Sequence, residues 1–192
     1  MAVSPSTLIL GIDPGIINLG LAVCLLSETG SFSVTNVSTN KIGANTDDIS
    51  TLSTNLLSFF QHVYATFSLS SYSRVIVGIE RQKKHTNDNV LIVESILWGI
   101  ITAANITCYA IDPATVKRLS GIGCNGHAEN KKKAVELMRQ LNIVVNADHE
   151  ADAVITAMYG VLPKLGIDAK TLPRYQKKKK TEEKKRKDIG DY

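Results

Sequence analysis

The sequence has no long hydrophobic run, few cysteines and few aromatic residues. No apolar stretch approaches the roughly 20 residues that a membrane-spanning helix needs. The N-terminus shows neither a secretory signal nor an Arg-rich, Ser-rich presequence. The three cysteines lack the number and spacing of a disulfide framework or zinc site. We therefore expect an intracellular protein of a reducing compartment, viral or bacterial in origin, that is not secreted and has no membrane partner.

Charge is divided unevenly between the body of the chain and its C-terminal end. From Lys170 onward there are 10 basic and 4 acidic residues, whereas the first 169 residues carry 12 basic and 14 acidic ones. The lysine-rich stretch 177–187 offers almost no apolar side chain to bury. We predict one domain over residues 1–169 and a basic, disordered tail over residues 170–192. The tail is interpreted as a polyanion tether or nuclear-import signal, with simple solubilisation as the alternative.

The order of hydrophobic patterns predicts an α/β fold. Three β-type runs at 7–12, 19–26 and 32–39 are separated by turns and indicate an antiparallel meander. Strands at 74–80 and 107–111 then alternate with helices. Helices are expected from an Asp47 cap for about 20 residues, from residue 87 or 88, over 113–119 with Asp112 as cap, over 128–141 and over 148–164. The sequence therefore predicts a mixed five-stranded sheet, a meander followed by parallel strands, flanked by helices.

Acidic side chains stand at the ends of two predicted strands and at the start of the last helix. Asp13 ends the first strand, and Glu80 ends the strand at 74–80. Asp148 and His149 lie four and three residues before Asp152, so each can share a helix face with it. Carboxylates that converge from distant segments are typical of divalent-cation sites. The alternatives are that Asp13 is an ordinary turn residue and that Glu80 is an exposed residue at a strand end. The helix dipole alone would favour acids at the start of the last helix, but it does not explain Asp152.

Basic residues follow these acids along the chain. They are typical of contacts to phosphates beside a scissile bond, with an ordinary solvated surface as the alternative. The candidate DNA-binding residues are Arg81, Lys83, Lys84, Lys117, Arg118, Lys131, Lys132 and Lys133. The glycine-rich loop 121–126 lacks the Lys-Ser/Thr ending of a P-loop.

Three motifs together resemble a known family. Gly-Ile-Asp-Pro-Gly at 11–15, Ile-Glu-Arg-Gln at 79–82 and Asp-His-Glu-Ala-Asp-Ala at 148–153 occur in the order found in RuvC-type Holliday junction resolvases. That family belongs to the ribonuclease-H-like superfamily, and the likeness extends over residues 8–165. The Glu80-Arg81-Gln82 triplet is closest to the poxviral and fungal mitochondrial branch.

The resemblance implies an enzyme that cuts four-way DNA junctions and leaves 5′-phosphate and 3′-hydroxyl ends. It implies a ribonuclease-H-like fold, a homodimer, and two Mg²⁺ ions per site for which Mn²⁺ can substitute, with no small-molecule cofactor. Its ligands would be Asp13, Glu80 and Asp152 with either Asp148 or His149. Lys117 and Lys132, or a neighbour of Lys132, would steady the phosphate.

Several alternatives stay open at the level of sequence. His149 could act on the attacking water or the leaving group instead of a metal. The same acids would serve a nuclease acting on RNA–DNA hybrids or flaps, and a non-catalytic junction-binding protein is a third reading. An actin-like ATPase is disfavoured because the chain is short and lacks a second Asp-x-Gly turn. The apolar helix around Leu91–Ile101, with Trp98, is the candidate dimer contact, and burial in the core is its alternative.

Overall fold

The chain folds around one five-stranded sheet, in a computed structural model that describes residues 4–82, 88–123 and 126–177. The strand order is β3-β2-β1-β4-β5. Strands β1 to β3 are antiparallel, whereas β4 runs parallel to β1 and β5 parallel to β4, which confirms the predicted mixed sheet. The bounds are β1 (Ser4–Asp13), β2 (Leu19–Leu26), β3 (Phe32–Asn40), β4 (Tyr72–Glu80) and β5 (Thr107–Ile111).

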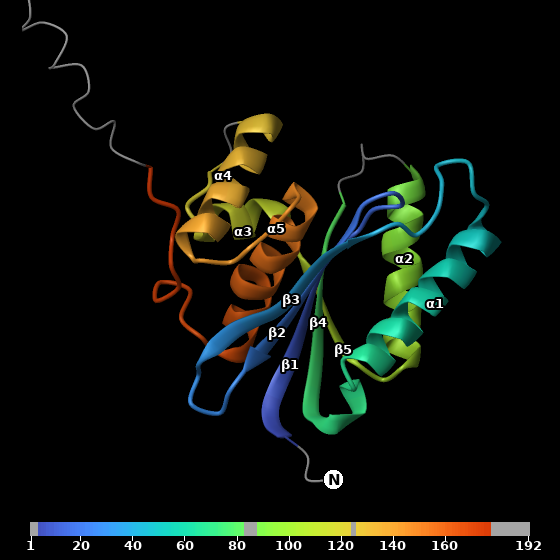
Figure 1. The fold of residues 1–192 in the computed structure, drawn as a ribbon, viewed down its shortest axis with the longest axis horizontal. Helices are drawn as coiled ribbons and strands as arrows, with labels where there is room; N and C mark the ends of the chain where they lie inside the picture. Colours follow the sequence, from blue (N-terminus) through green and yellow to red (C-terminus); the bar gives the residue numbers. More distant parts are fainter. Residues whose placement is uncertain (1–3, 83–87, 124–125, 178–192) are drawn as a thin grey trace, which may run out of the picture.

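Helices cover both faces of this sheet (Figure 1). One face carries α1 (Ile49–Thr66) and α2 (Asp88–Ala103), and the short η1 (Leu69–Ser71) leads into β4. The other face carries α3 (Pro113–Leu119), α4 (His127–Gln140) and α5 (Asp148–Ile155). The single helix expected over 148–164 is three segments, because α5 continues as π-helical η2 (Thr156–Val161) and then η3 (Leu162–Leu165). Within the described ranges, no helix combines the length and hydrophobicity needed to cross a membrane.

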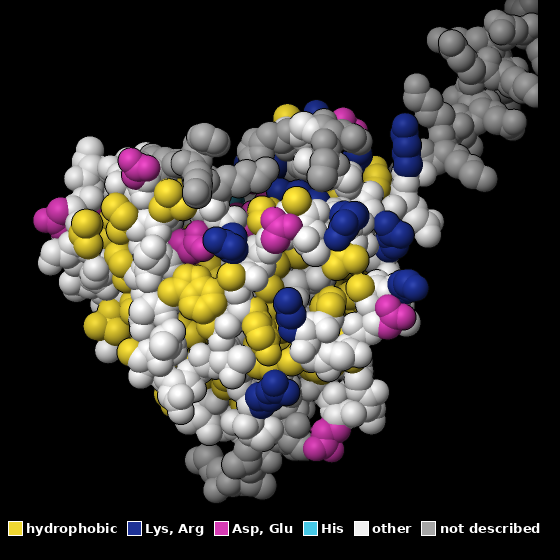
Figure 2. All heavy atoms as spheres, turned by 180° about the vertical axis from the view of Figure 1, so that it is seen from behind, with side chains coloured by type: hydrophobic (Ala, Val, Ile, Leu, Met, Phe, Trp, Pro, Cys, Tyr) yellow, Lys and Arg dark blue, Asp and Glu magenta, His cyan; other side chains and the backbone are white. Residues whose placement is uncertain are grey.

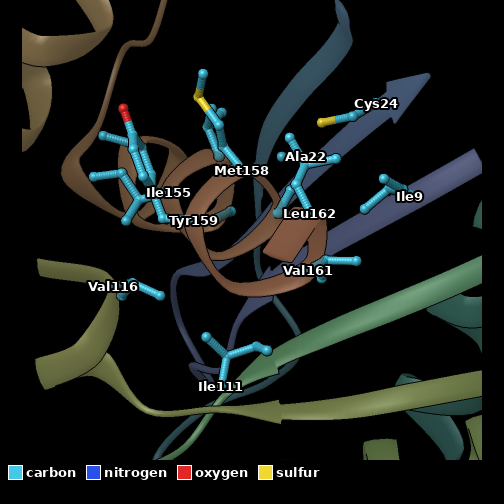
Figure 3. Packing of buried hydrophobic residues seen from close by; sticks show 14 of the residues in the cluster. Ile9, Ala22, Cys24, Ile111, Val116, Ile155, Met158, Tyr159, Val161 and Leu162 are labelled. Carbon is cyan, nitrogen blue, oxygen red and sulfur yellow. The ribbon is translucent and has the colours of Figure 1, made fainter. Parts of the chain in front are cut away.

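Period-two alternation along the central strands decides which side chains meet which helices. In β1, Leu8, Leu10 and Ile12 pack in the hydrophobic cluster beneath α1 and α2, whereas Ile9 packs in the cluster beneath α5 and η2. Figure 3 shows this second cluster, where the strand residue Ile9 lies near the helical turn that carries Val161. The same alternation places the side chains that end β1 and β4 on the α5 face of the sheet.

Glycines allow α5 and η2 to lie directly on the sheet. A Cβ added to Gly11 would stand 2.1 Å from the carbonyl oxygen of Ala153, and one added to Gly20 would stand 2.1 Å from that of His149. A Cβ on Gly78 of β4 would likewise meet Val161 Cγ2 at 2.5 Å. Because backbone meets backbone at the first two points, the position of α5 relative to β1 and β2 is fixed closely.

Side-chain caps begin two of the helices. Asp112 accepts from the amide of Thr115 at 2.9 Å and starts α3, as predicted. The cap of α1 is Asp48, which accepts from Thr51 N at 2.7 Å, and not the predicted Asp47. Asp47 instead accepts from Ala44 N at 2.8 Å and closes the loop before the helix. Both aspartates suit a cap chemically, so the loop geometry decides between them.

A C-terminal strap, residues 171–177, packs back against the body. Leu172 is buried in the cluster beneath α5 and η2, and the hydroxyl of Tyr159 donates to the carbonyl of Pro173. The amide of Tyr175 donates to Ser120 O at 2.8 Å. The expected tail from residue 170 therefore includes a segment, residues 171–177, that packs along the domain, while residues 178–192 lie outside the described part of the chain.

Candidate active site

Asp13 and Glu80 end neighbouring parallel strands at the same edge of the sheet. The register pairs Ile12 with Ile79, so the two acids come next on adjacent strands and on the same face. Both are buried, with 7% and 8% of their surface exposed. The backbone beyond Glu80 is held by two hydrogen bonds, from Arg81 N to Ile111 O and from Gln82 N to the carboxylate of Glu94, both 2.8 Å.

Helix α5 adds the third and fourth groups. Nδ1 of His149 lies 2.8 Å from Oδ2 of Asp13. Asp152, one turn later, is close enough for its charge to act on Glu80, and the charge of Asp13 acts on Asp152. The start of α5 is held by buried Glu150, which accepts from Asn146 N at 2.6 Å and from a threonine of β3 at 3.3 Å. The predicted convergence of two strand ends and one helix is thus present.

The charge of Asp13 disfavours the charged forms of Glu80 and Asp152. Burial, and then the charges of Asp13 and Asp152, raise the pKa of Glu80 to about 8, and the nearby Lys117 ammonium only partly offsets them. Burial and the charge of Asp13 raise the pKa of Asp152 to about 6. The Lys117 ammonium offsets this effect only in part, and a divalent cation bound at the acids would supply the further positive charge.

One carboxylate oxygen of the cluster has no partner in the described residues. Oε2 of Glu80 is buried without a hydrogen bond, a state that costs free energy unless another group compensates. As the side chains stand, no three His, Cys, Asp or Glu groups of the described ranges are grouped tightly enough to hold a metal ion. The chemistry of the donors fits Mg²⁺, which prefers oxygen ligands, and the hydrogen bond between His149 and Asp13 takes up one of those oxygens.

Asp148 and His149, left as alternatives by the sequence, have different surroundings. Asp148 forms an ion pair with Lys131 of α4. Although partial burial alone would raise the pKa of Asp148, the hydrogen bond from Lys131 and the neighbouring charge of His149 hold it below its usual value. The hydrogen bond to Asp13 raises the pKa of His149. His149 therefore points into the acidic cluster, whereas Asp148 is engaged by a lysine beside it.

The candidate basic residues are only partly gathered at the acids. Lys117 acts electrostatically on both Glu80 and Asp152, and of the lysine triplet it is Lys131 that reaches the cluster. Lys133 pairs with Glu129 at 2.8 Å. Three further candidates, Arg81, Arg118 and Lys132, are exposed, and Lys83 and Lys84 lie outside the described residues.

One face of the molecule shows an uneven distribution of basic side chains. In Figure 2, most of the Lys and Arg side chains in view lie on the half of the molecule that holds α3, α4 and the strap. The other half, with α1 and α2, shows mainly hydrophobic and uncharged side chains on this face. The basic surface therefore lies on the side of the sheet where α5 brings its acids.

Three contributors escaped the sequence-based prediction. Gly20 has no functional side chain, but it allows the backbone of His149 to pack closely against β2. The sequence indicates this only by a small residue within an apolar strand. Glu150 stands in the motif at 148–153 without any feature that sets it apart from the other acids, although it is a buried structural acceptor. Arg174 belongs to the segment assigned to the tail and lies beside α3, where its side chain donates to Arg118 O at 3.2 Å.

Comparisons with known proteins agree on the fold. No family model matches the sequence, and no curated protein matches it significantly. Among solved structures, RuvC of Thermus thermophilus is similar with a TM-score of 0.63 and 20% identity over 83% of this chain and 96% of that one. The same protein in complex with a Holliday junction substrate gives 0.62 at 18% identity. The yeast mitochondrial Holliday junction resolvase Ydc2 gives 0.55 at 18% identity, covering 81% and 79% of the two chains. The chain therefore has the RuvC-like, ribonuclease-H-like fold.

Proposed function

We propose that this chain is a structure-selective endonuclease that resolves four-way DNA junctions by paired hydrolytic cuts, leaving 5′-phosphate and 3′-hydroxyl ends. One observation carries the proposal: three carboxylates and a histidine from β1, β4 and α5 meet at one edge of a RuvC-like sheet. The fold likeness to RuvC and Ydc2 supports it, since both of those structures are of junction resolvases or their complexes.

The acids would hold two Mg²⁺ ions, with Mn²⁺ able to substitute. The unpartnered oxygen of Glu80 and the raised pKa values of Glu80 and Asp152 support this assignment. When bound, the ions would supply activation of water and stabilisation of the leaving 3′ oxygen. Of the two candidates for the fourth ligand we favour His149, because Lys131 neutralises Asp148.

The basic groups of the chain would position the substrate. Lys117 stands near enough to Glu80 and Asp152 to offset part of the rise in the pKa of each, so its ammonium would contact the scissile phosphate that these acids face. Lys131 would join it from α4, as the neighbour of Lys132 that the resemblance allowed. The role of Asp13 toward His149 is to orient the ring and favour its protonated form when no metal is present.

The test is cleavage of a synthetic four-way junction with Mg²⁺. Asp13→Asn and Asp152→Asn should abolish cleavage and leave junction binding largely intact. Asp48→Asn is the matched control, because this aspartate is exposed, caps α1, and is replaced by an equally good cap. Cleavage by either active-site variant at the wild-type rate would reject the site. Preference for an RNA–DNA hybrid or flap in a competition assay would replace the junction as substrate, and absence of any metal-dependent nicking would indicate a binding protein.

A homodimer is part of the proposal, because two symmetric cuts need two sites. The inner face of α2, with Val93, Leu97 and Ile101, is buried in the core, so the whole helix is not available for a dimer contact. Between α1 and α2 the surface instead holds an apolar hollow of about 540 Å³. It includes Leu57 and Tyr64, which are 46% and 42% exposed.

Sedimentation of the full chain tests the dimer. We expect Tyr64→Glu to give a monomer that nicks junctions without the paired cut. Glu28→Gln, on the exposed turn after β2, should leave the oligomeric state unchanged. A wild-type chain that sediments as a monomer at cleavage concentrations would reject this contact.

A further inference from the structure

A hollow of about 480 Å³ lies between α3, the loop that follows it and the C-terminal strap, and one of its lining residues, Asp112, is near enough for its charge to act on Glu80. Its lining includes Asp112, Arg118, Gly121, Gly123 and Arg174. Arg118 comes from α3, and Arg174 comes from the strap, 56 residues later. The hollow thus collects two guanidinium groups from segments distant in the sequence.

The strap holds Arg174 in place through its backbone. The residues on either side are tied to the body, Pro173 through its carbonyl to the Tyr159 hydroxyl and Tyr175 through its amide to Ser120 O. The turn after α3 uses Gly121 at a φ of 79°, a backbone conformation that favours glycine, and Tyr175 packs directly against it. A side chain held in this way loses little further freedom when it binds a ligand.

The hollow is positive and its other polar groups are already occupied. Within residues 4–82, 88–123 and 126–177, neither Arg118 nor Arg174 forms an ion pair. The acid in the lining, Asp112, accepts from the amide and the hydroxyl of Thr115 at 2.9 and 2.6 Å. The amides of Gly121 and Gly123 donate hydrogen bonds to carbonyl oxygens of α3, at 3.3 and 3.1 Å. An incoming anion would therefore bind to the two guanidinium groups and not to the loop backbone.

The position of the hollow links it to the acids. Lys117 and Arg118 are consecutive on α3, and one helical step turns them about 100° apart. Lys117 acts on Glu80 and Asp152, whereas Arg118 lines the hollow. A nucleic acid strand that presents one phosphate to the acids would carry a neighbouring phosphate past the hollow.

We propose that Arg118 and Arg174 form a phosphate-binding subsite that holds a backbone phosphate of the nucleic acid adjacent to the one that is cut. The inference rests on the proposed nuclease function and extends it to the strap, which the site chemistry does not otherwise involve. Arginine suits this role because its planar fork binds phosphate oxygens in pairs.

The test is the salt dependence of junction binding by the full chain, measured in EDTA so that no cleavage occurs. We expect Arg118→Gln and Arg174→Gln each to lower the slope of log Kobs against log salt by about 0.9, with an affinity loss of about tenfold at low salt. Arg74→Gln is the matched control, since Arg74 is exposed at the start of β4, at the opposite end of the sheet. Unchanged slopes for both variants, with unaltered thermal midpoints, would overturn the subsite.

A second experiment distinguishes binding of free phosphate from binding of nucleic acid, and it tests the phosphate-binding subsite separately from the catalytic proposal. Inorganic phosphate alone is titrated while the arginine side-chain resonances are followed by NMR. If phosphate shifts them but Arg174→Gln leaves the DNA slope unchanged, the hollow serves a free anion and the nucleic acid assignment is overturned. If the wild type cleaves nothing yet both slopes fall as expected, the subsite stands and the catalytic proposal fails. If the wild type cleaves and neither slope falls, the subsite alone is wrong.

Discussion

Replacement of Glu80 by glutamine tests whether the acids are held together at a cost in stability. The pKa of Glu80 is raised from 4.5 to about 8 by burial and by Asp13 and Asp152. Between these two values the folded state binds more protons than the unfolded chain, so the free energy of unfolding falls as the pH rises through the window. At about 1.4 kcal/mol per pKa unit, the upper limit of this fall in the free energy of unfolding is near 5 kcal/mol. Since the neighbouring acids share the repulsion, we expect about 2–3 kcal/mol for Glu80 itself.

The assay is urea unfolding in EDTA, followed by circular dichroism at about pH 5 and about pH 8. The free energy of unfolding of Glu80→Gln should match that of the wild type closely at the lower pH and exceed it by about 2–3 kcal/mol at the higher pH. For a domain of this size, the same difference corresponds to a rise of roughly 4–12 °C in the thermal midpoint. Glu28→Gln, an exposed glutamate, is the control. Mg²⁺ should stabilise the wild type at the higher pH and have a much smaller effect on Glu80→Gln. Parallel pH profiles for wild type and Glu80→Gln would refute the reasoning.

Three further predictions follow from the site. Gly20→Ala should destabilise the domain by about 1–3 kcal/mol and reduce cleavage, because its Cβ would meet the backbone of His149, and an unchanged midpoint in thermal unfolding would reject this close contact. His149→Ala should lower cleavage far more than Asp148→Asn, and equal losses in single-turnover assays would reject the choice of His149. Tyr159→Phe should release the strap at Pro173 and raise hydrogen exchange across residues 171–177, and unchanged exchange would show that this bond does not hold it.

Much of the architecture could be predicted because it depends on local pattern. The strands at 19–26 and 107–111 have the expected bounds, since apolar runs bounded by turns leave few alternatives. Asp13 and Glu80 could be expected to meet, because carboxyl ends of parallel strands share one edge of a sheet.

Other features depend on tertiary contacts that no local pattern records. The seat of Gly20 against α5 and the ion pair of Asp148 with Lys131 join segments far apart in the chain. The strap is held largely through backbone carbonyls and amides, which every sequence possesses, so its lysine-rich surroundings suggested a tail. The change from α-helix to π-helix after Ile155 likewise could not be predicted, because no proline or glycine precedes it in α5.

The direction of the strands has a practical consequence for observing this protein at work. Because β1 and β4 both run toward the acids, the turn from β2 to β3 lies at the opposite end of the sheet. That turn, closed by a hydrogen bond from Ser27 N to Ser31 O at 2.9 Å, exposes Thr29 at its tip. A fluorescent dye attached to a cysteine at position 29 would report on the position of the chain from the end of the sheet opposite the acids. The two buried or half-buried described cysteines, Cys24 and Cys108, would compete little for the label.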